Sequence, residues 1–210
     1  MKKNILVALA LCFSLALYSC GKKDEKVTTE TKKENTPTPT NTTTPSSDAN
    51  TNTAASYYTV SSVTGSSTKN VSPNFTWEEN GKKMSMADLK GNVVLVNLWA
   101  TWCGPCKKEI PDLSKISQEM KDKNFKMIGV NVFQNPKSQA IGDYLKTNPI
   151  PYTILDAGDD FVKAFSDATK SEIEAVPTTF VIDKKGNIVE TIVGARDEAT
   201  FKSTINKYLN

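Results

Sequence analysis

A buried strand that ends at a pair of cysteines constrains this chain more than any other feature. Residues Asn92 to Ala100 are almost continuously apolar and rich in valine, which is typical of a strand covered on both faces. Cys103 and Cys106 follow at once, with Gly104 and Pro105 between them. An apolar helical pattern begins at Pro105, so the sequence predicts that both cysteines lie at a strand-to-helix junction.

The start of a helix is a favourable place for a reactive thiol. Unpaired backbone N–H groups and a partial positive charge stabilise a thiolate there and lower the cysteine pKa below its usual ~8.5. The spacing brings Cys106 beneath Cys103 within one turn, close enough for a disulfide. Pro105 suits the first helical turn, and Gly104 lets a partner chain approach. We expect Cys103 to be the nucleophile and Cys106 the resolving thiol.

A zinc site and a purely structural disulfide are the other common uses of such a pair. The chain has no histidine and no second Cys-x-x-Cys pair, so a zinc site of about four ligands cannot close within it. A disulfide that spans so few residues would constrain the unfolded chain little. The lack of histidine also excludes imidazole base catalysis and Cys-His nucleophiles. We therefore expect redox chemistry without a metal or other cofactor.

Residues 1–19 are expected to be a lipoprotein signal peptide. Two lysines precede an uncharged apolar run from Ile5 to Tyr18, which is shorter than the ~20 residues that span a bilayer. The run ends in Leu-Tyr-Ser-Cys at Cys20, which resembles the bacterial lipobox. This resemblance implies that Cys20 is lipidated and anchors the chain in a lipid bilayer.

Residues 20–70 are expected to form a disordered tether and residues 71–210 a single domain. Thr, Ser, Asn, Pro and Lys dominate the first stretch, which has too little apolar surface to offset the entropy of ordering it. The second stretch carries enough apolar residues for a core. Its 18 Lys and Arg balance 18 Asp and Glu, so it lacks the excess positive charge that binds a phosphate backbone. We expect no nucleic-acid partner.

Around the cysteines the pattern alternates strands and helices. Asn80-Gly81 predicts a hairpin turn near the start of the domain. Helices are expected at Pro105–Lys123, Ser138–Lys146, Asp160–Ser166 and Glu198–Leu209, and strands at Lys126–Phe133, Tyr152–Leu155, Thr178–Asp183 and Ile188–Val193. Asp197 can cap the last helix. The alternation implies a parallel core, to which the closing hairpin adds antiparallel edges, so an α/β fold with a mixed sheet between helices is predicted.

The segment Val93 to Pro111, VVLVNLWATWCGPCKKEIP, closely resembles the thioredoxin-like proteins of the TlpA/ResA type, which are membrane-tethered thiol–disulfide oxidoreductases of bacteria. The resemblance covers roughly residues 73 to 209. It implies a thioredoxin-like fold with an N-terminal β-hairpin and a central helix–strand insertion at Asn135 to Asp156. It also implies a cis bond between Val176 and Pro177, opposite the cysteines, where free backbone groups pair with an extended substrate.

The same resemblance implies roles for three further side chains. Glu109 matches the family's acidic residue near the active site, which tunes thiol pKa values or shuttles a proton, although a solvated glutamate is the alternative. Asn97 stands where cytoplasmic thioredoxins carry a buried aspartate, which moves any proton transfer toward Glu109 or water. Trp102 is expected beside the disulfide, either as a substrate contact or as a structural aromatic.

Together these features predict a thiol–disulfide oxidoreductase of the bacterial cell envelope that reduces protein disulfides outside the cytoplasm. After processing, Cys103 and Cys106 are the only free thiols, so electrons must come from another protein, and a membrane-embedded donor is implied. A thiol peroxidase is one alternative, although Val96 replaces the proline that such enzymes carry seven residues before the cysteine. A non-catalytic binding or holdase module on a lipoprotein is the other.

Overall fold

The computed structural model describes residues 56–209. The expected signal peptide, Cys20 and the expected tether as far as residue 55 lie outside the described residues. The described strands are β1 (Tyr58–Thr64), β2 (Asn74–Glu79), β3 (Lys82–Ser85), β4 (Val93–Trp99), β5 (Phe125–Asn131), β6 (Thr153–Asp156), β7 (Thr178–Ile182) and β8 (Ile188–Val193). The helices are the short 3-10 helix η1 (Met86–Leu89) and α1 (Gly104–Glu119), α2 (Ile141–Thr147), α3 (Asp159–Thr169) and α4 (Glu198–Leu209).

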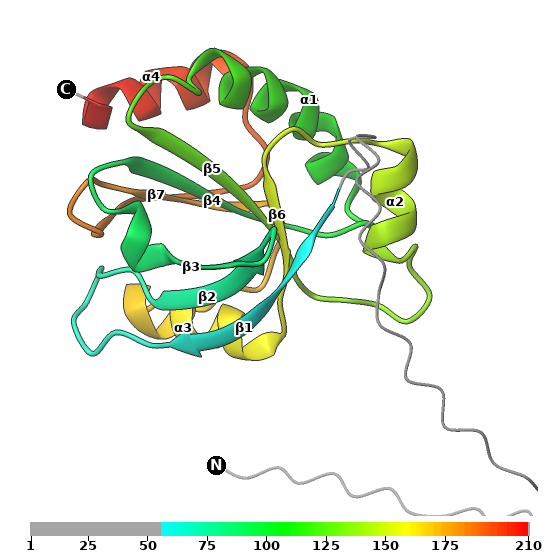
Figure 1. Ribbon diagram of the computed structural model, residues 1–210, viewed down its shortest axis with the longest axis horizontal. Helices are drawn as coiled ribbons and strands as arrows, with labels where there is room; N and C mark the ends of the chain where they lie inside the picture. Colours follow the sequence, from blue (N-terminus) through cyan, green and yellow to red (C-terminus); the bar gives the residue numbers. More distant parts are fainter. Residues whose placement is uncertain (1–55, 210) are drawn as a thin grey trace, which may run out of the picture. The chain divides into compact units, whose positions relative to one another are not determined.

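The strands form one mixed sheet in the order β3-β2-β1-β6-β5-β4-β7-β8. Strands β1, β6, β5 and β4 are parallel neighbours, whereas the neighbouring pairs β4–β7, β7–β8, β1–β2 and β2–β3 are antiparallel. Helices α1 and α4 cover one face and α3 covers the other (Figure 1). The predicted α/β fold with a mixed sheet between helices is confirmed.

The folded part begins earlier than the sequence predicted. Residues Tyr58–Thr64, which we assigned to the disordered tether, form β1 in the interior of the sheet, between β2 and β6. Half-buried Tyr58 and Val60 alternate with exposed polar residues, and a register shift between Val60 and Ser62 places Val63 on the same core, as in a half-buried strand with an irregularity. Composition alone obscured this signal, because the seven residues continue the Thr- and Ser-rich texture of the tether.

The N-terminal hairpin and the central insertion lie where the sequence placed them. Asn80 and Gly81 have φ values of 52° and 75°, the left-handed pair that a tight hairpin turn between β2 and β3 requires. Helix α2 and strand β6 form the insertion between β5 and α3. Helix α1 contains Pro111, as expected, but ends at Glu119 rather than Lys123. Asp197 accepts a 2.9 Å hydrogen bond from the Thr200 N–H and so caps α4.

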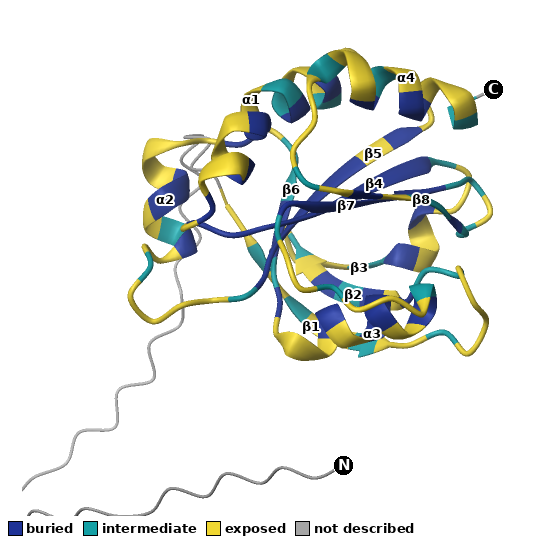
Figure 2. Cartoon of the chain, turned by 180° about the vertical axis from the view of Figure 1, so that it is seen from behind, coloured by how far each residue is buried: buried dark blue, intermediate teal, exposed yellow. Residues whose placement is uncertain are grey.

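Strand β4 divides the core because its side chains alternate between the two faces. Val94, Val96 and Leu98 pack with aromatic residues of β2, α3 and β7. Val93 and Leu95 pack on the opposite face against apolar residues of α1 and α4. Burial on both faces is visible as the continuous dark strands in Figure 2. The strand that delivers the cysteines is therefore held rigidly from both sides.

None of the helices within residues 56–209 combines the length and apolar character needed to cross a membrane.

Candidate redox site

Cys103 and Cys106 are joined by a disulfide at the start of α1. Their sulfurs are 1.99 Å apart and their Cα atoms 5.3 Å apart. Cys103 occupies the N-cap position, and its sulfur accepts a 3.2 Å hydrogen bond from the Cys106 backbone N–H. Cys103 retains 3% of its surface and Cys106 none. The predicted order, with Cys103 nearer the solvent and Cys106 one turn inside, is the order in the structure.

The two residues between the cysteines leave the disulfide approachable. Gly104 and Pro105 are both exposed. No atom lies within 4 Å of the place where a side chain of Gly104 would begin. At Gly104 the surface beside Cys103 is therefore backbone, with open space in front of it. Within residues 56–209 no three His, Cys, Asp or Glu side chains gather as metal ligands would.

The loop before β7 faces the disulfide. The bond between Val176 and Pro177 is cis, as the family resemblance implied. The Val176 carbonyl oxygen lies 3.5 Å from the Cys103 sulfur. Pro177 is buried and its carbonyl accepts a 2.8 Å hydrogen bond from the Gly194 N–H, which fixes the loop against the end of β8. The structure thus brings Val176 and Pro177 to the cysteines, although they are about 70 residues apart in sequence.

Trp102 is the exposed aromatic residue of the site. It keeps 49% of its surface in solvent, and its indole N–H donates a 2.8 Å hydrogen bond to the Phe133 carbonyl. The buried cluster that encloses the two cysteines contains Trp99 instead. Trp102 is therefore held at its indole nitrogen while about half of its surface remains in solvent.

Glu109 is buried one helical turn after Cys106, on the same side of α1. The Asn97 side-chain amide donates a 2.9 Å hydrogen bond to Glu109 Oε1, and the Arg196 backbone N–H donates a 3.3 Å bond to Oε2. Burial raises the pKa of Glu109 from 4.5 to about 7, against the lowering effect of the Asn97 and Arg196 hydrogen bonds. The alternative of a solvated glutamate is therefore wrong for this chain.

Two partners of the Glu109 network escaped sequence reasoning. Asn97 also donates a 2.9 Å hydrogen bond to the Thr179 hydroxyl, 82 residues away, and Arg196 lies 87 residues from Glu109. No local pattern connects positions so distant in sequence. The only available signal was that Thr179 lies on a strand predicted to be buried, where a polar side chain needs a hydrogen-bond partner.

Aromatic residues close the inner side of the site. Trp99 packs against Tyr144 of the insertion at 5.4 Å between ring centroids, and the Lys107 ammonium lies 5.6 Å from the Tyr144 ring centroid. Burial, followed by the nearby charge of Glu109, raises the pKa of Tyr152, so its hydroxyl stays protonated. The insertion therefore supplies part of the wall around the cysteines, while Glu109 is the group there that titrates near neutrality.

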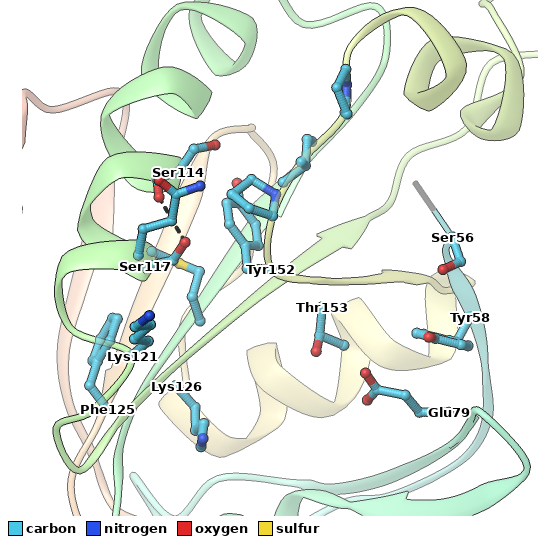
Figure 3. Close-up of a pocket in the computed structure, with 15 residues that line it drawn as sticks. Ser56, Tyr58, Glu79, Ser114, Ser117, Lys121, Phe125, Lys126, Tyr152 and Thr153 are labelled. Atoms are coloured by element: carbon cyan, nitrogen blue, oxygen red, sulfur yellow. Dashed lines mark hydrogen bonds between the residues drawn. The ribbon is translucent and has the colours of Figure 1, made fainter. Parts of the chain in front are cut away.

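A groove beside α1 is separate from the cysteines. It has a volume of about 830 Å³ and lies between α1 and β1, with Ser114, Ser117, Tyr58 and Tyr152 among its lining residues (Figure 3). Neither cysteine, Val176 nor Trp102 lines it. The site is thus identified by the chemistry of its side chains, and the size of a cavity does not locate it.

Comparison with known proteins places these features in a family. Residues 66–209 match the Redoxin family. The thiol-disulfide oxidoreductase ResA of Bacillus subtilis strain 168 is 32% identical over 140 residues, which cover 66% of this chain and 72% of that protein. The sporulation thiol-disulfide oxidoreductase A of the same strain is 29% identical over 107 residues, covering 50% of this chain and 61% of that protein.

Solved structures agree with the fold. A thioredoxin-family thiol:disulfide interchange protein from Chlorobium tepidum TLS has a TM-score of 0.60 and 33% identity, covering 70% of this chain and all of that one. A protein described as a putative protein disulfide isomerase from Bacteroides thetaiotaomicron has a TM-score of 0.54 and 27% identity, covering 68% of this chain and 89% of that one. The matched region contains the disulfide, Glu109 and the cis proline.

Proposed function

Since this chain belongs to the Redoxin family, with thioredoxin-fold relatives of the TlpA/ResA type, and is a thiol–disulfide oxidoreductase, we propose that it reduces disulfides of other proteins through Cys103 and Cys106. The observation that carries the proposal is the disulfide at the N-terminus of α1, with the Cys106 N–H directed at the Cys103 sulfur. That donor and the helix dipole favour a thiolate at Cys103 once the disulfide is open.

The reaction proceeds by two exchange steps. The Cys103 thiolate attacks one sulfur of a substrate disulfide, which forms a mixed disulfide and releases the other substrate sulfur as a thiolate. The Cys106 thiolate then attacks the Cys103 sulfur, re-forms the internal disulfide and releases the second substrate thiolate. Two electrons pass to the substrate, and the two released thiolates take up two protons.

Glu109 is suited to proton transfer in the second step. Cys106 is fully buried, so its thiol loses a proton only to a neighbouring group or to a water that enters the site. With a pKa of about 7, the Glu109 carboxylate accepts a proton near neutral pH and releases it again at little cost. Asn97, which is uncharged, holds the carboxylate in place by its hydrogen bond.

The substrate is expected to lie along the loop before β7. Val176 offers backbone groups beside Cys103, and open space at Gly104 with the exposed Pro105 leaves room for a second chain. Pairing of an extended substrate with Val176 would hold its disulfide near the Cys103 sulfur. Trp102, directly before Cys103 and half exposed, offers an aromatic surface for contact with the substrate.

We further propose that the domain works outside the cytoplasm, on a lipid anchor at Cys20. The support is the signal-like N-terminal sequence, together with a cysteine pair whose reduction needs an external supply of electrons. A membrane-embedded donor would supply them. Incorporation of labelled palmitate into the full chain, lost in Cys20→Ser and retained in Cys12→Ser, tests the anchor.

Turnover by the purified full chain tests the proposed activity. Reduced protein should reduce the disulfides of insulin and the small disulfide of Ellman's reagent, ending with the Cys103–Cys106 bond formed. Consumption of hydrogen peroxide without disulfide reduction would favour the thiol peroxidase alternative. Substrate binding that persists unchanged in a Cys103→Ser/Cys106→Ser variant, with no reduction by the wild type, would favour the binding module.

A further inference from the structure

A second cavity adjoins the redox site on the side of α3. Its volume is about 350 Å³. Three apolar residues, Phe133, Val162 and Ile173, form part of its lining, and the rest is polar or charged: Asp159, Lys163, Ser166, Asp167 and Glu172. Nothing in the exchange chemistry of the cysteines uses these residues.

One hydrogen bond and one short stretch of chain link this cavity to Cys103. Trp102, the residue before Cys103, donates its indole hydrogen bond to the carbonyl of Phe133, which lines the cavity. Val176, whose carbonyl lies 3.5 Å from the Cys103 sulfur, is three residues after Ile173, which also lines it. Because an extended chain advances about 3.3 Å per residue, a polypeptide whose cysteine is at Cys103 reaches the cavity within a few residues.

The apolar lining is held in place from below. Phe133 and Ile173 are half-buried and pack on the core that contains α3, and Val162 is itself part of that core. The Ile173 backbone N–H donates a 3.2 Å hydrogen bond to the Ser166 hydroxyl, which ties the loop to α3. The lining therefore offers a preformed apolar surface, so a bound side chain would not first have to order the loop.

The segment that contains α3 and the loop after it, residues 156–174, carries a strongly negative net charge. From Asp156 to Glu174 the chain carries six carboxylates and two lysines, a net charge of −4, although the part of the chain from Val71 onward is neutral. Lys163 forms a 2.7 Å ion pair with Asp167, so one of the two positive charges is already matched. Asp159 and Glu172 remain on the rim of the cavity. Such a rim attracts cationic groups and repels carboxylates.

We propose that this cavity is a substrate subsite, which receives an apolar side chain near the target cysteine and pairs with a basic residue beside it. The proposal rests on the proposed function and deepens it, since it defines the substrates as polypeptides whose disulfide is flanked by an apolar and a cationic residue. Apolar contact with Phe133 and Ile173 supplies affinity, and the acidic rim supplies selectivity and a faster encounter.

Reduction of matched peptides by the full chain, first converted to its Cys103/Cys106 dithiol form, tests the subsite. Each peptide contains one intramolecular disulfide and one test dipeptide, which is Leu-Lys, Leu-Glu or Gly-Lys. The dipeptide lies two residues from a cysteine. It precedes that cysteine in one set of peptides and follows it in the other set. In low salt, wild type should reduce Leu-Lys about tenfold faster than Leu-Glu in at least one set. Asp159→Lys/Glu172→Lys should abolish or invert this ratio, whereas the exposed Asp122→Lys, away from the cavity, should leave it unchanged. Ile173→Ser should reduce the preference for Leu-Lys over Gly-Lys.

The outcomes separate the subsite from the activity itself. Equal rates for all peptides in both sets, with efficient reduction of Ellman's reagent, would overturn the subsite and leave the proposed function standing. A Leu-Lys preference that survives the double charge reversal would also overturn it. Failure of wild type on every disulfide, the small reagent included, would overturn both.

Discussion

The Asn97 side-chain amide donates a 2.9 Å hydrogen bond to Glu109 Oε1, and both side chains are buried between β4 and α1. The same amide group donates to the Thr179 hydroxyl, which leaves the Asn97 carbonyl oxygen buried without a partner among the described residues. A buried carboxyl group is thus held by a neutral donor, and no positively charged side chain is bonded to it. Burial therefore raises the pKa of Glu109 to about 7, and the hydrogen bonds from Asn97 and Arg196 lower it only in part.

Replacing each cysteine separately should give different defects. Cys103→Ser should lose disulfide reduction by about a thousandfold or more, because the thiolate is the nucleophile. Cys106→Ser should still attack but should accumulate the mixed disulfide, visible by mass spectrometry and on non-reducing gels. A mixed disulfide that forms through Cys106 in Cys103→Ser, at the wild-type rate, would reverse the assignment.

Glu109 should make the oxidised protein less stable as the pH rises. Its folded pKa of about 7 exceeds the unfolded value of 4.5, so the folded state binds more protons between these values and stability falls as the pH increases through them. The loss amounts to about 3 kcal/mol, at 1.36 kcal/mol per pKa unit. Urea unfolding at pH 5 and pH 8 measures it.

The chain offers a clean background for that measurement. It has no histidine, and the two site cysteines do not titrate while joined. Glu109→Gln should abolish most of the pH dependence between pH 5 and 8, whereas the exposed Asp122→Asn should preserve it. An unchanged slope in Glu109→Gln would mean that another group titrates there.

Removing the Asn97 amide should move the Glu109 titration upward. Asn97→Ala deletes a hydrogen bond that lowers the pKa of Glu109, so the midpoint of the pH-dependent stability change should lie above 7. Thr179→Val is the matched control, because it removes a hydrogen bond of the same amide without touching Glu109. Each variant should lose about 1–3 kcal/mol of stability. If the Asn97→Ala and Thr179→Val variants had the same midpoint, the Asn97 hydrogen bond would not be what lowers the pKa of Glu109.

Strand β1 should be essential to the domain. A chain that starts at Val71 lacks the strand between β2 and β6, and so loses the burial of Val60 and Val63. We expect a loss of about 3–5 kcal/mol relative to a chain that starts at Ser56, measured by urea unfolding. Faster amide exchange in β2 and β6 should accompany it. Equal stability of the two chains would mean that β1 adds nothing to the fold.

The sequence predicted those features that depend on local patterns. Three such features each follow from a few adjacent residues: the apolar run that forms β4, the helix start at Cys103 and the Asn80-Gly81 turn. The structure contains all three. The family resemblance supplied the cis bond at Pro177. Strand β1 was missed because its polar residues resemble the preceding segment, and its burial arises only when β2 and β6 flank it.

Contacts between distant segments could not be predicted in this way. The bonds of Asn97 to Thr179 and of Trp102 to Phe133 join residues 82 and 31 positions apart. The sequence identified Glu109 as an acidic residue near the cysteines, but its burial and raised pKa depend on β4, β7 and the Arg196 turn closing around it. The pKa of the Glu109 carboxyl group is therefore determined by three-dimensional packing and not by local sequence propensity.

The equilibrium redox potential of Cys103 and Cys106 decides whether this pair reduces the disulfides of other proteins. The full chain would be equilibrated in dithiothreitol or glutathione buffers of defined potential, and the fraction of disulfide measured by thiol trapping. We predict a reversible two-electron couple in the reducing range, about −270 to −200 mV. A potential near −120 mV would contradict the reducing direction, and the absence of any reversible exchange would show that the two cysteines are not a redox couple.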